Sequence, residues 1–229
     1  MTFARARARL ARAGFGVSAA LPVDVYDTCV PDPWRAERVR PGTRSVWVIA
    51  SAGRTLWSRF RDSPEFALED DPLDRYSARV VREAAGRCEP SAGTALYFEQ
   101  RGGRYLPLVE LAERAGVGRS GRMGLLLHPV YGPWISIRAL LYVTDATAPR
   151  SPDPFAPCAG CPAPCASACH GDAIGPCSID VERCYAARLK RAPCREACDA
   201  RSACVIGQEH AFSREQIAHH SRIREARRR

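Results

Sequence analysis

Eleven cysteines constrain this 229-residue chain more than any other feature, because most of them lie in one stretch. Nine fall between Cys158 and Cys204, whereas Cys29 and Cys88 stand alone. A small secreted domain uses such density for disulfides, but a large part of this chain is almost free of cysteine. Residues 1–16 show neither the apolar core nor the small-residue cleavage site of a secretory signal. We therefore expect a cytoplasmic protein, in whose reducing compartment clustered cysteines are metal ligands.

The remaining composition is that of an ordinary globular protein. Hydrophobic residues make up 46% of the chain and charged residues 26%, which argues against disorder, collagen and coiled coil. The length suits one medium domain, or one domain with a small appendage. Apolar runs such as residues 135–143 are interrupted by Arg138 and fall far short of the roughly 20 residues of a membrane span. We therefore expect no membrane segment.

A polar break near residues 145–157, rich in Pro, Asp and Ser, is typical of a linker. It predicts a folded domain over residues 1–147 and a cysteine-rich module with a polar tail over residues 148–229. Apolar periodicity predicts helices and strands in the first part, with Gly14 ending the first helix. We expect helices over Ala4–Ala13, Thr55–Arg61, Asp74–Ala85 and Leu106–Ala115, and strands over Ser45–Ala50, Ala95–Glu99, Gly124–Leu127 and Ile135–Val143, the last two flanking a turn at His128–Pro133.

The spacing of the clustered cysteines favours iron–sulfur chemistry. A [4Fe–4S] cluster needs one thiolate for each iron, and in bacterial two-cluster ferredoxins the last cysteine of each run binds the other cluster. The runs here depart from the usual C-x2-C-x2-C-x3-C-P, since one spacer is longer and His170 replaces the proline. A pair of structural zinc sites is the alternative, although nine thiols exceed what two tetrahedral zinc sites need. The runs are Cys158-x2-Cys161-x3-Cys165-x3-Cys169, then Cys177 and Cys184, then Cys194-x3-Cys198-x5-Cys204.

The cysteine module resembles the C-terminal iron–sulfur part of epoxyqueuosine reductase and of the reductive dehalogenases. The segment Ile179–Leu189, IDVERCYAARL, is similar to the stretch that carries a lone cysteine there. The resemblance implies two [4Fe–4S] clusters in a ferredoxin-like module, with Cys184 rather than Cys177 as a ligand. The implied ligand sets are Cys158, Cys161, Cys165 and Cys204 for one cluster, and Cys169, Cys184, Cys194 and Cys198 for the other.

The N-terminal part resembles the cobalamin-processing proteins of the CblC type. Four segments carry the likeness: GFGV at Gly14–Val17 leading to Val25-Tyr26, the strand Val46–Ser51, DPLDRYSARVV at Asp71–Val81, and LHPVYGPWISIRALLYV at Leu127–Val143. Both resemblances imply an α+β fold of the nitroreductase or flavin-reductase kind, with a cobalamin site. One departure concerns the proton donor of epoxyqueuosine reductase, an acidic residue shortly before a Pro-x-x-Glu motif. The motif is present at Pro107–Glu110, but the acidic position falls near Arg104.

Several residues are candidates for holding the cobalamin. Tyr131 and Trp134 flank Gly132 and offer flat faces to a corrin ring, with core packing as the alternative. His128 precedes a proline in the same turn, and a lone histidine is more often structural. Arg138 lies inside an apolar run, so it needs a partner carboxylate or a polar group of the ligand.

A glycine-rich stretch spells G-x-G-x-x-G over residues 116–121, but it follows a helix pattern and fails as a dinucleotide fingerprint. In the epoxyqueuosine reductase likeness this stretch belongs to a cobalamin-domain loop. Its backbone amides, near Gly118 and Gly121, would then hold the phosphate of the nucleotide tail.

Together these features predict a cobalamin-binding iron–sulfur oxidoreductase. It would pass electrons from an external donor of the ferredoxin or flavodoxin type, through the clusters, to cobalt, and so remove the upper ligand, for example cyanide. The alternatives are a cobalamin-dependent reductase of an organic substrate, a ferredoxin-like carrier or cobalamin chaperone, and a zinc-stabilised nucleic-acid-binding protein. The net charge of +9 is mostly arginine, but much of it lies near the chain ends and no nucleic-acid motif is present. The sequence therefore argues against nucleic acid as a partner.

Overall fold

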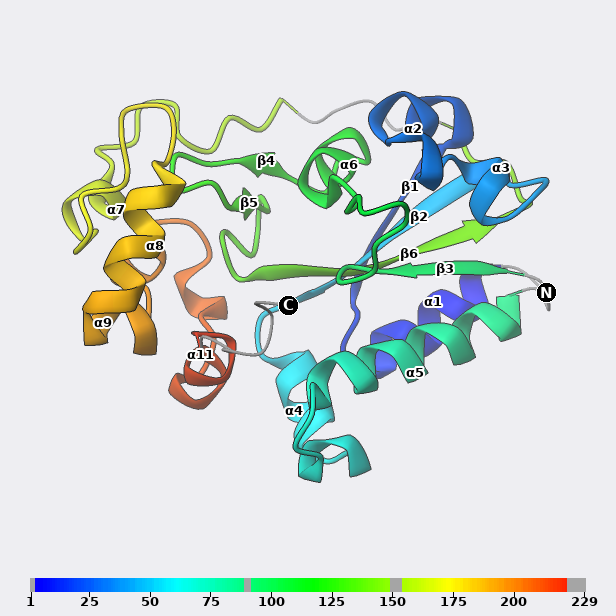
Figure 1. The fold of residues 1–229 in the computed structure, drawn as a ribbon, viewed down its shortest axis with the longest axis horizontal. Coiled ribbons are helices and arrows are strands. Elements are labelled where there is room, and N and C mark those ends of the chain that lie inside the picture. Colours follow the sequence, from blue (N-terminus) through cyan, green and yellow to red (C-terminus); the bar gives the residue numbers. More distant parts are fainter. Residues whose placement is uncertain (1–2, 89–91, 149–153, 222–229) are drawn as a thin grey trace. The chain divides into compact units, whose positions relative to one another are not determined.

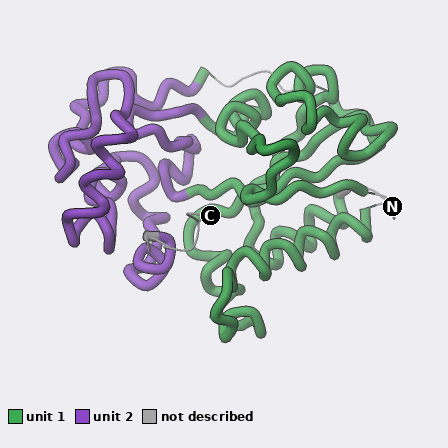
Figure 2. Tube along the Cα trace, in the orientation of Figure 1, with its two compact units in different colours: residues 1–118, 135–154 green, residues 119–134, 155–229 purple. Residues whose placement is uncertain are grey.

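The computed structural model describes residues 3–88, 92–148 and 154–221. The chain forms two compact units (Figure 2). The first comprises residues 1–118 and 135–154, and the second comprises residues 119–134 and 155–229. The second unit thus takes in sixteen residues that precede the predicted linker, because the segment 119–134 packs against the cysteine-rich part. Among the described residues, no helix combines the length and the apolar character that a membrane crossing requires.

A four-stranded antiparallel sheet organises the first unit (Figure 1). Its order is β1-β2-β6-β3, and the central pair is long because both strands are rich in Val, Ile and Leu. A bulge interrupts the β2–β6 register between Ile49 and Ala50. The strands are β1 (Val17–Pro22), β2 (Ser45–Ala52), β3 (Gly93–Leu96) and β6 (Ile135–Val143).

Helices cover both faces of this sheet, which gives an α+β unit (Figure 1). On one face α1 and α5 pack together over β6 and β3, and their buried side chains form the main core with Ile49 and Leu141. On the other face α2 and α6 lie against the sheet, and the Tyr26 and Tyr142 hydroxyls share a hydrogen bond of 2.7 Å. The helices are α1 (Phe3–Arg12), α2 (Val23–Cys29), α3 (Ala36–Val39), α4 (Thr55–Arg61), α5 (Pro72–Cys88) and α6 (Leu108–Arg114), with 3-10 turns at Asp32–Trp34 and Pro64–Ala67.

The second unit is built from short elements around a small core. Met123 and Leu127 pack there with Cys165, Ala200 and Cys204. The elements are the hairpin β4 (Arg119–Ser120) and β5 (Leu126–Leu127), then α7 (Pro164–Ser167), α8 (Val181–Lys190), α9 (Ala192–Glu196), α10 (Asp199–Ser202), a 3-10 turn at Gln208–His210 and α11 (Arg214–Ser221).

Most predicted elements of the first unit are confirmed, with shifted ends. The helix expected at 74–85 spans residues 72–88, and Gly14 ends α1 with φ of +94°. The strand expected at 95–99 is shorter and stops at Leu96, because the Glu99 carboxylate accepts the Leu96 N–H and closes a turn. The helix expected at 106–115 begins only after Pro107.

The two strands that flank the turn at 128–133 belong to different sheets, since β5 pairs with β4 whereas β6 pairs with β2 and β3. Part of the predicted linker is also ordered against the sheet, since the Asp145 carbonyl accepts the Ser45 hydroxyl at 2.6 Å. Residues 149–153 of that linker lie outside the described residues.

Candidate cofactor and metal site

The turn from His128 to Trp134 carries four of the predicted cofactor residues, and its shape is fixed by its own hydrogen bonds. His128 and Gly132 form a two-way backbone bridge, at 2.9 and 2.8 Å. The His128 Nδ1 accepts the backbone N–H groups of Val130 and Tyr131, at 3.0 and 3.3 Å. Burial, with a smaller contribution from His210, lowers the pKa of His128. A neutral ring with an accepting Nδ1 carries its proton on Nε2. His128 therefore stabilises the turn through Nδ1 and keeps its Nε2–H as a hydrogen-bond donor.

This turn lies against the segment that follows Cys204. Gly132 has φ of +52° and Gly207 has φ of +69°. A Cβ on Gly132 would lie 2.0 Å from the Ile206 carbonyl oxygen, and a Cβ on Gly207 would lie 2.4 Å from the Tyr131 carbonyl carbon. Only glycine permits two backbones to approach so closely. Gly132 is therefore required by packing.

Trp134 is buried beneath an arginine that the sequence did not single out. The Arg201 guanidinium lies 5.0 Å from the Trp134 ring centroid and 4.6 Å from that of Phe212. It donates to the Pro133 carbonyl oxygen at 3.1 and 2.5 Å. Burial lowers its pKa to about 10, so it stays charged at neutral pH, and the nearby Cys198 opposes that shift. Arg201 and Cys198 also line a small cavity with Trp134.

The first group of thiols gathers around α7. Cys165 and Cys204 are buried in the small core, and Cys158 packs against it. Burial raises the pKa of Cys165, a backbone N–H lowers it, and the neighbouring Cys158, Cys204 and Cys161 raise it further. The pKa of Cys204 is likewise raised by burial first, and then by Cys158 and Cys161. These four cysteines therefore lie within electrostatic reach of one another.

The second group gathers around α8 and α9, which pack together. Burial raises the pKa of Cys184, and Cys198, Cys169 and Cys194 add to the shift. The same neighbours, Cys169 and Cys198, act on Cys194. The Cys169 Sγ accepts the Ala173 N–H at 3.4 Å, a contact that stabilises a thiolate. These four cysteines therefore also lie within electrostatic reach of one another.

These two groups coincide with the two ligand sets that the resemblance implies, while the exposed Cys177 appears in neither. The eight cysteines of the two groups are free thiols. Within the described residues, no three Cys, His, Asp or Glu side chains close around a single metal ion. Thiolates are the donors that iron–sulfur clusters take, one for each iron. The chemistry of each group of four thiols therefore fits one such cluster.

The remaining predicted residues lie apart from this turn in the chain. Arg138, in the first unit, is buried with Asp74, at 3.6 Å between Nη1 and Oδ1, and lies over the Tyr97 ring. The carboxylate that the sequence left as the alternative is therefore present, although the Arg138 Nε makes no hydrogen bond. Gly121 meets the Leu127 side chain, since a Cβ there would lie 2.6 Å from its Cδ1. Gly118 is the last residue of the first unit before β4.

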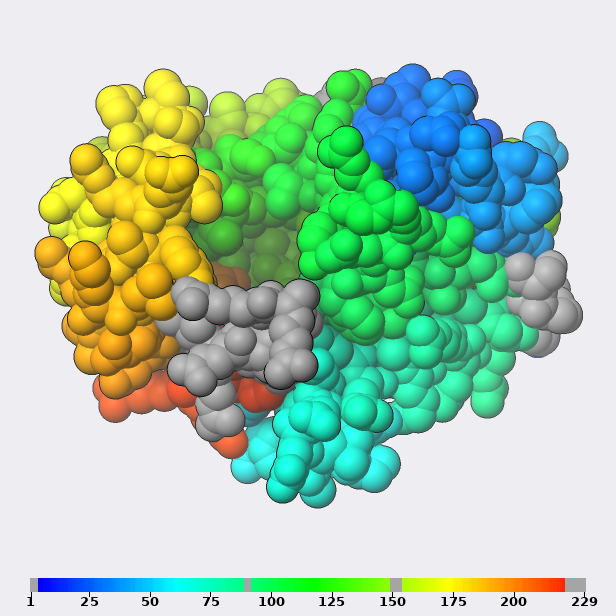
Figure 3. Space-filling view, in the orientation of Figure 1, coloured from blue at the N-terminus to red at the C-terminus, as the bar shows by residue number. Residues whose placement is uncertain are grey.

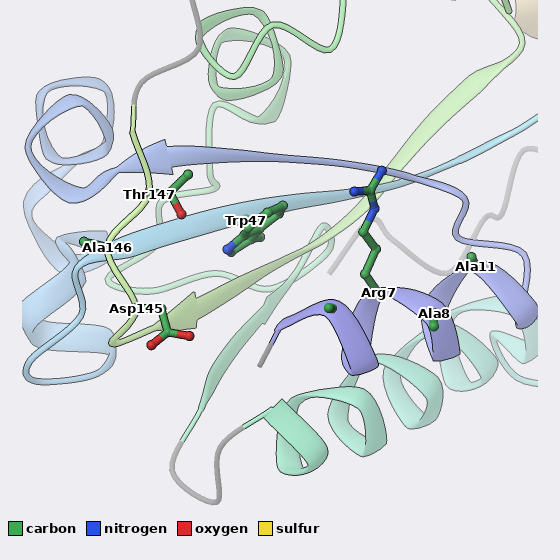
Figure 4. Close-up of a pocket in the computed structure, with 8 residues that line it drawn as sticks. Arg7, Ala8, Ala11, Trp47, Asp145, Ala146 and Thr147 are labelled. Atoms are coloured by element: carbon green, nitrogen blue, oxygen red, sulfur yellow. The ribbon is translucent and has the colours of Figure 1, made fainter. Parts of the chain in front are cut away.

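The first unit also carries an open groove beside α1 (Figure 4). Trp47 of β2 lies in the middle of it, with Arg7 toward one end and Asp145 toward the other. None of the seven predicted cofactor residues is among the residues that line it.

No protein-family model matches the sequence, and no curated protein matches it. Solved structures match in fold. A crystal structure of epoxyqueuosine reductase with an epoxyqueuosine-modified tRNA stem loop has a TM-score of 0.59 at 16% identity, over 91% of this chain and 66% of that one. The B12-trafficking protein CblC of C. elegans has a TM-score of 0.60 at 13% identity, over 96% and 92%. A catabolic reductive dehalogenase has a TM-score of 0.60 at 16% identity, over 94% and 33%.

These matches confirm the predicted likeness at the level of fold. The chain spans just under two thirds of the length of the epoxyqueuosine reductase and one third of the length of the dehalogenase.

Proposed function

We propose that this protein is a cobalamin-binding iron–sulfur oxidoreductase that delivers electrons to the cobalt of B12 and so removes its upper ligand, such as cyanide. One observation carries the proposal: eight cysteines fall into the two groups of four that the resemblance to iron–sulfur modules implies. The α+β fold, shared with a B12-trafficking protein and two kinds of reductase, supports it. Bound iron–sulfur clusters would supply one-electron transfer at low potential.

The chain's own residues would bind, orient and shield these groups. Cys158, Cys161, Cys165 and Cys204 would hold one cluster, and Cys169, Cys184, Cys194 and Cys198 the other. Because burial raises the pKa of several of these thiols, metal binding has to displace their protons. In the second unit the residues proposed to meet the corrin are His128, Tyr131, Gly132, Trp134 and Gly121, and in the first unit they are Gly118 and Arg138.

A reductase that acts on an organic substrate is the second candidate, because the fold match includes epoxyqueuosine reductase and a dehalogenase. Such a reaction needs a proton donor. Arg104 lies where the resemblance expects an acid, and a guanidinium does not give up its proton at neutral pH. The chain therefore favours removal of a ligand from cobalt, which needs no acidic side chain.

The test is anaerobic purification, followed by iron and sulfide analysis and absorption spectra with and without cyanocobalamin. We expect about eight irons per chain, and loss of the cyanocobalamin spectrum once a reductant is added. Zinc without iron would refute the proposal in favour of a zinc-stabilised protein. Full iron loading with an unchanged corrin spectrum would leave a ferredoxin-like carrier, and corrin binding without reduction would leave a chaperone.

A further inference from the structure

Helix α8 presents three large apolar side chains to solvent. Val181, Tyr185 and Leu189 are 70%, 47% and 42% exposed. Their spacing of four residues places them in one row along the helix. The helix is held from its other side, where Ala187 is buried and meets Gly171. Scattered apolar residues on a surface need no explanation, but a continuous row on one helix marks a candidate interaction site.

Basic residues lie close to this row along the chain. Arg188, Lys190, Arg191 and Arg195 lie on α8, on α9 and at the junction between them, and all except Arg188 are exposed. Only two acidic residues, Glu182 and Glu196, lie among them in the stretch 181–196. We call the row and these four basic residues the α8 face. In Figure 3 the atoms of this stretch, coloured yellow to orange, form exposed surface of the second unit.

The α8 face shares its helix with one ligand of a proposed cluster. Cys184 is on the same helix, next to Tyr185 and one turn before Arg188, and it is only partly buried. Cys194 follows on α9, which packs against α8. The α8 face therefore lies close in the fold to two of the proposed thiolate ligands.

We propose that the α8 face docks an acidic, low-potential electron-transfer protein that reduces the cluster held by Cys169, Cys184, Cys194 and Cys198. This inference rests on the proposed function. An apolar centre with a charged rim is typical of protein interfaces, and the charge of the rim selects the partner. A basic rim selects an acidic surface. In each encounter the donor loses one electron, the cluster gains it, and the oxidised donor leaves without exchange of atoms.

A second copy of this chain fits the face less well, because two basic faces repel each other. Nucleic acid would use the charge but not the aliphatic side chains Val181 and Leu189. The acidic protein is the occupant that uses both parts of the face.

The experiment measures, by stopped flow, how fast a flavodoxin in its two-electron-reduced form reduces the anaerobically purified full chain. It compares the wild-type protein with a test variant and a control variant. The test variant is Leu189→Ser/Lys190→Glu. The matched control, Leu68→Ser/Arg12→Glu, changes an exposed leucine and an exposed arginine in the first unit. We expect the test variant to lower the second-order rate constant about tenfold or more at low salt, and the control to leave it unchanged. Lys190→Arg should retain the wild-type rate.

Dithionite reduction and iron content separate the possible failures. Suppose that the test and control variants both hold full iron and react alike with dithionite. If flavodoxin then also reduces them at equal rates, docking at the α8 face is wrong and the proposed function is unaffected. If the test variant instead loses affinity for tRNA while its rate with flavodoxin is unchanged, the face serves RNA and the proposal is wrong. A wild-type protein without iron overturns both this proposal and the proposed function.

Discussion

The contact between Gly132 and Ile206 leads to the sharpest stability prediction. A methyl group at position 132 would lie 2.0 Å from a carbonyl oxygen that belongs to backbone, so a flexible side chain cannot relieve the clash. If the turn moves, the two-way hydrogen bonds between His128 and Gly132 are strained as well. We therefore expect Gly132→Ala to be among the most destabilising single-methyl changes in the chain.

The expected cost follows from two contributions. A non-glycine residue in the left-handed region costs about 1–2 kcal/mol, and forcing extra volume into packed structure costs about 1–3 kcal/mol. The sum is about 2–5 kcal/mol, a large share of the total stability of a typical protein. For a chain of this length it corresponds to a Tm that is lower by about 4–20 °C.

Thermal unfolding followed by circular dichroism measures this change. Gly103→Ala is the control, because Gly103 has φ of +71° and nothing within 4 Å of its Cβ position. Gly103→Ala should lower the free energy of unfolding only by the conformational cost of about 1–2 kcal/mol. Gly207→Ala disturbs the same approach from the other side, so the double variant should cost less than the sum of the two single changes. Equal Tm values for Gly132→Ala and Gly103→Ala would show that the two backbones do not meet.

Three further outcomes are expected. Burial holds the pKa of His128 below its ordinary 6.5, so the unfolded chain binds more protons and the free energy of unfolding falls as pH drops through 6.5; urea titrations at pH 7.5 and 5.5 should show a smaller fall for His128→Asn. Asp74→Asn removes the counter-charge of buried Arg138 and should cost about 3–5 kcal/mol in urea unfolding, where a loss below about 1 kcal/mol would contradict the pair. Iron analysis should find the wild-type content in Cys177→Ser and about half of it in Cys184→Ser, and equal contents would contradict the ligand assignment.

The sequence predicts the elements of the first unit well because their apolar patterns are strong. SVWVIA and ISIRALLYV are dense in β-branched and apolar residues, and they form the two central strands. The edge strand Val17–Pro22 was not predicted, because Ser, Ala and Pro give it little β-propensity, and its place is set by pairing with β2. The local apolar pattern thus identifies strands that are buried on both faces. The edge strand forms because it pairs with β2, which lies further along the chain.

The extent of the second unit could not be predicted in the same way. A Pro-rich stretch after residue 145 is a clear boundary signal, and it correctly precedes the cysteine-rich module. Nothing in residues 119–134 indicates that this segment joins that module, since Met123 and Leu127 are ordinary apolar residues. Two glycines of this segment acquire a reason only in the fold: a Cβ on Gly124 would lie 2.7 Å from the Ile179 side chain, and a Cβ on Gly132 would lie 2.0 Å from the Ile206 carbonyl oxygen.

Two arginines, the buried Arg138 and the partly buried Arg201, show what the sequence reveals of a site and what it leaves out. Arg138 was recognised as buried because it interrupts an apolar strand, and the structure supplies the carboxylate that such a charge requires. Arg201 escaped notice because it lies in the polar segment DARSAC. It is partly buried all the same, over the rings of both Trp134 and Phe212, with the Pro133 carbonyl as acceptor and Cys198 nearby. Local sequence can signal that a charge is buried, but its partners come from other segments, so the arginine beside a proposed cluster ligand could be found only once the chain was folded.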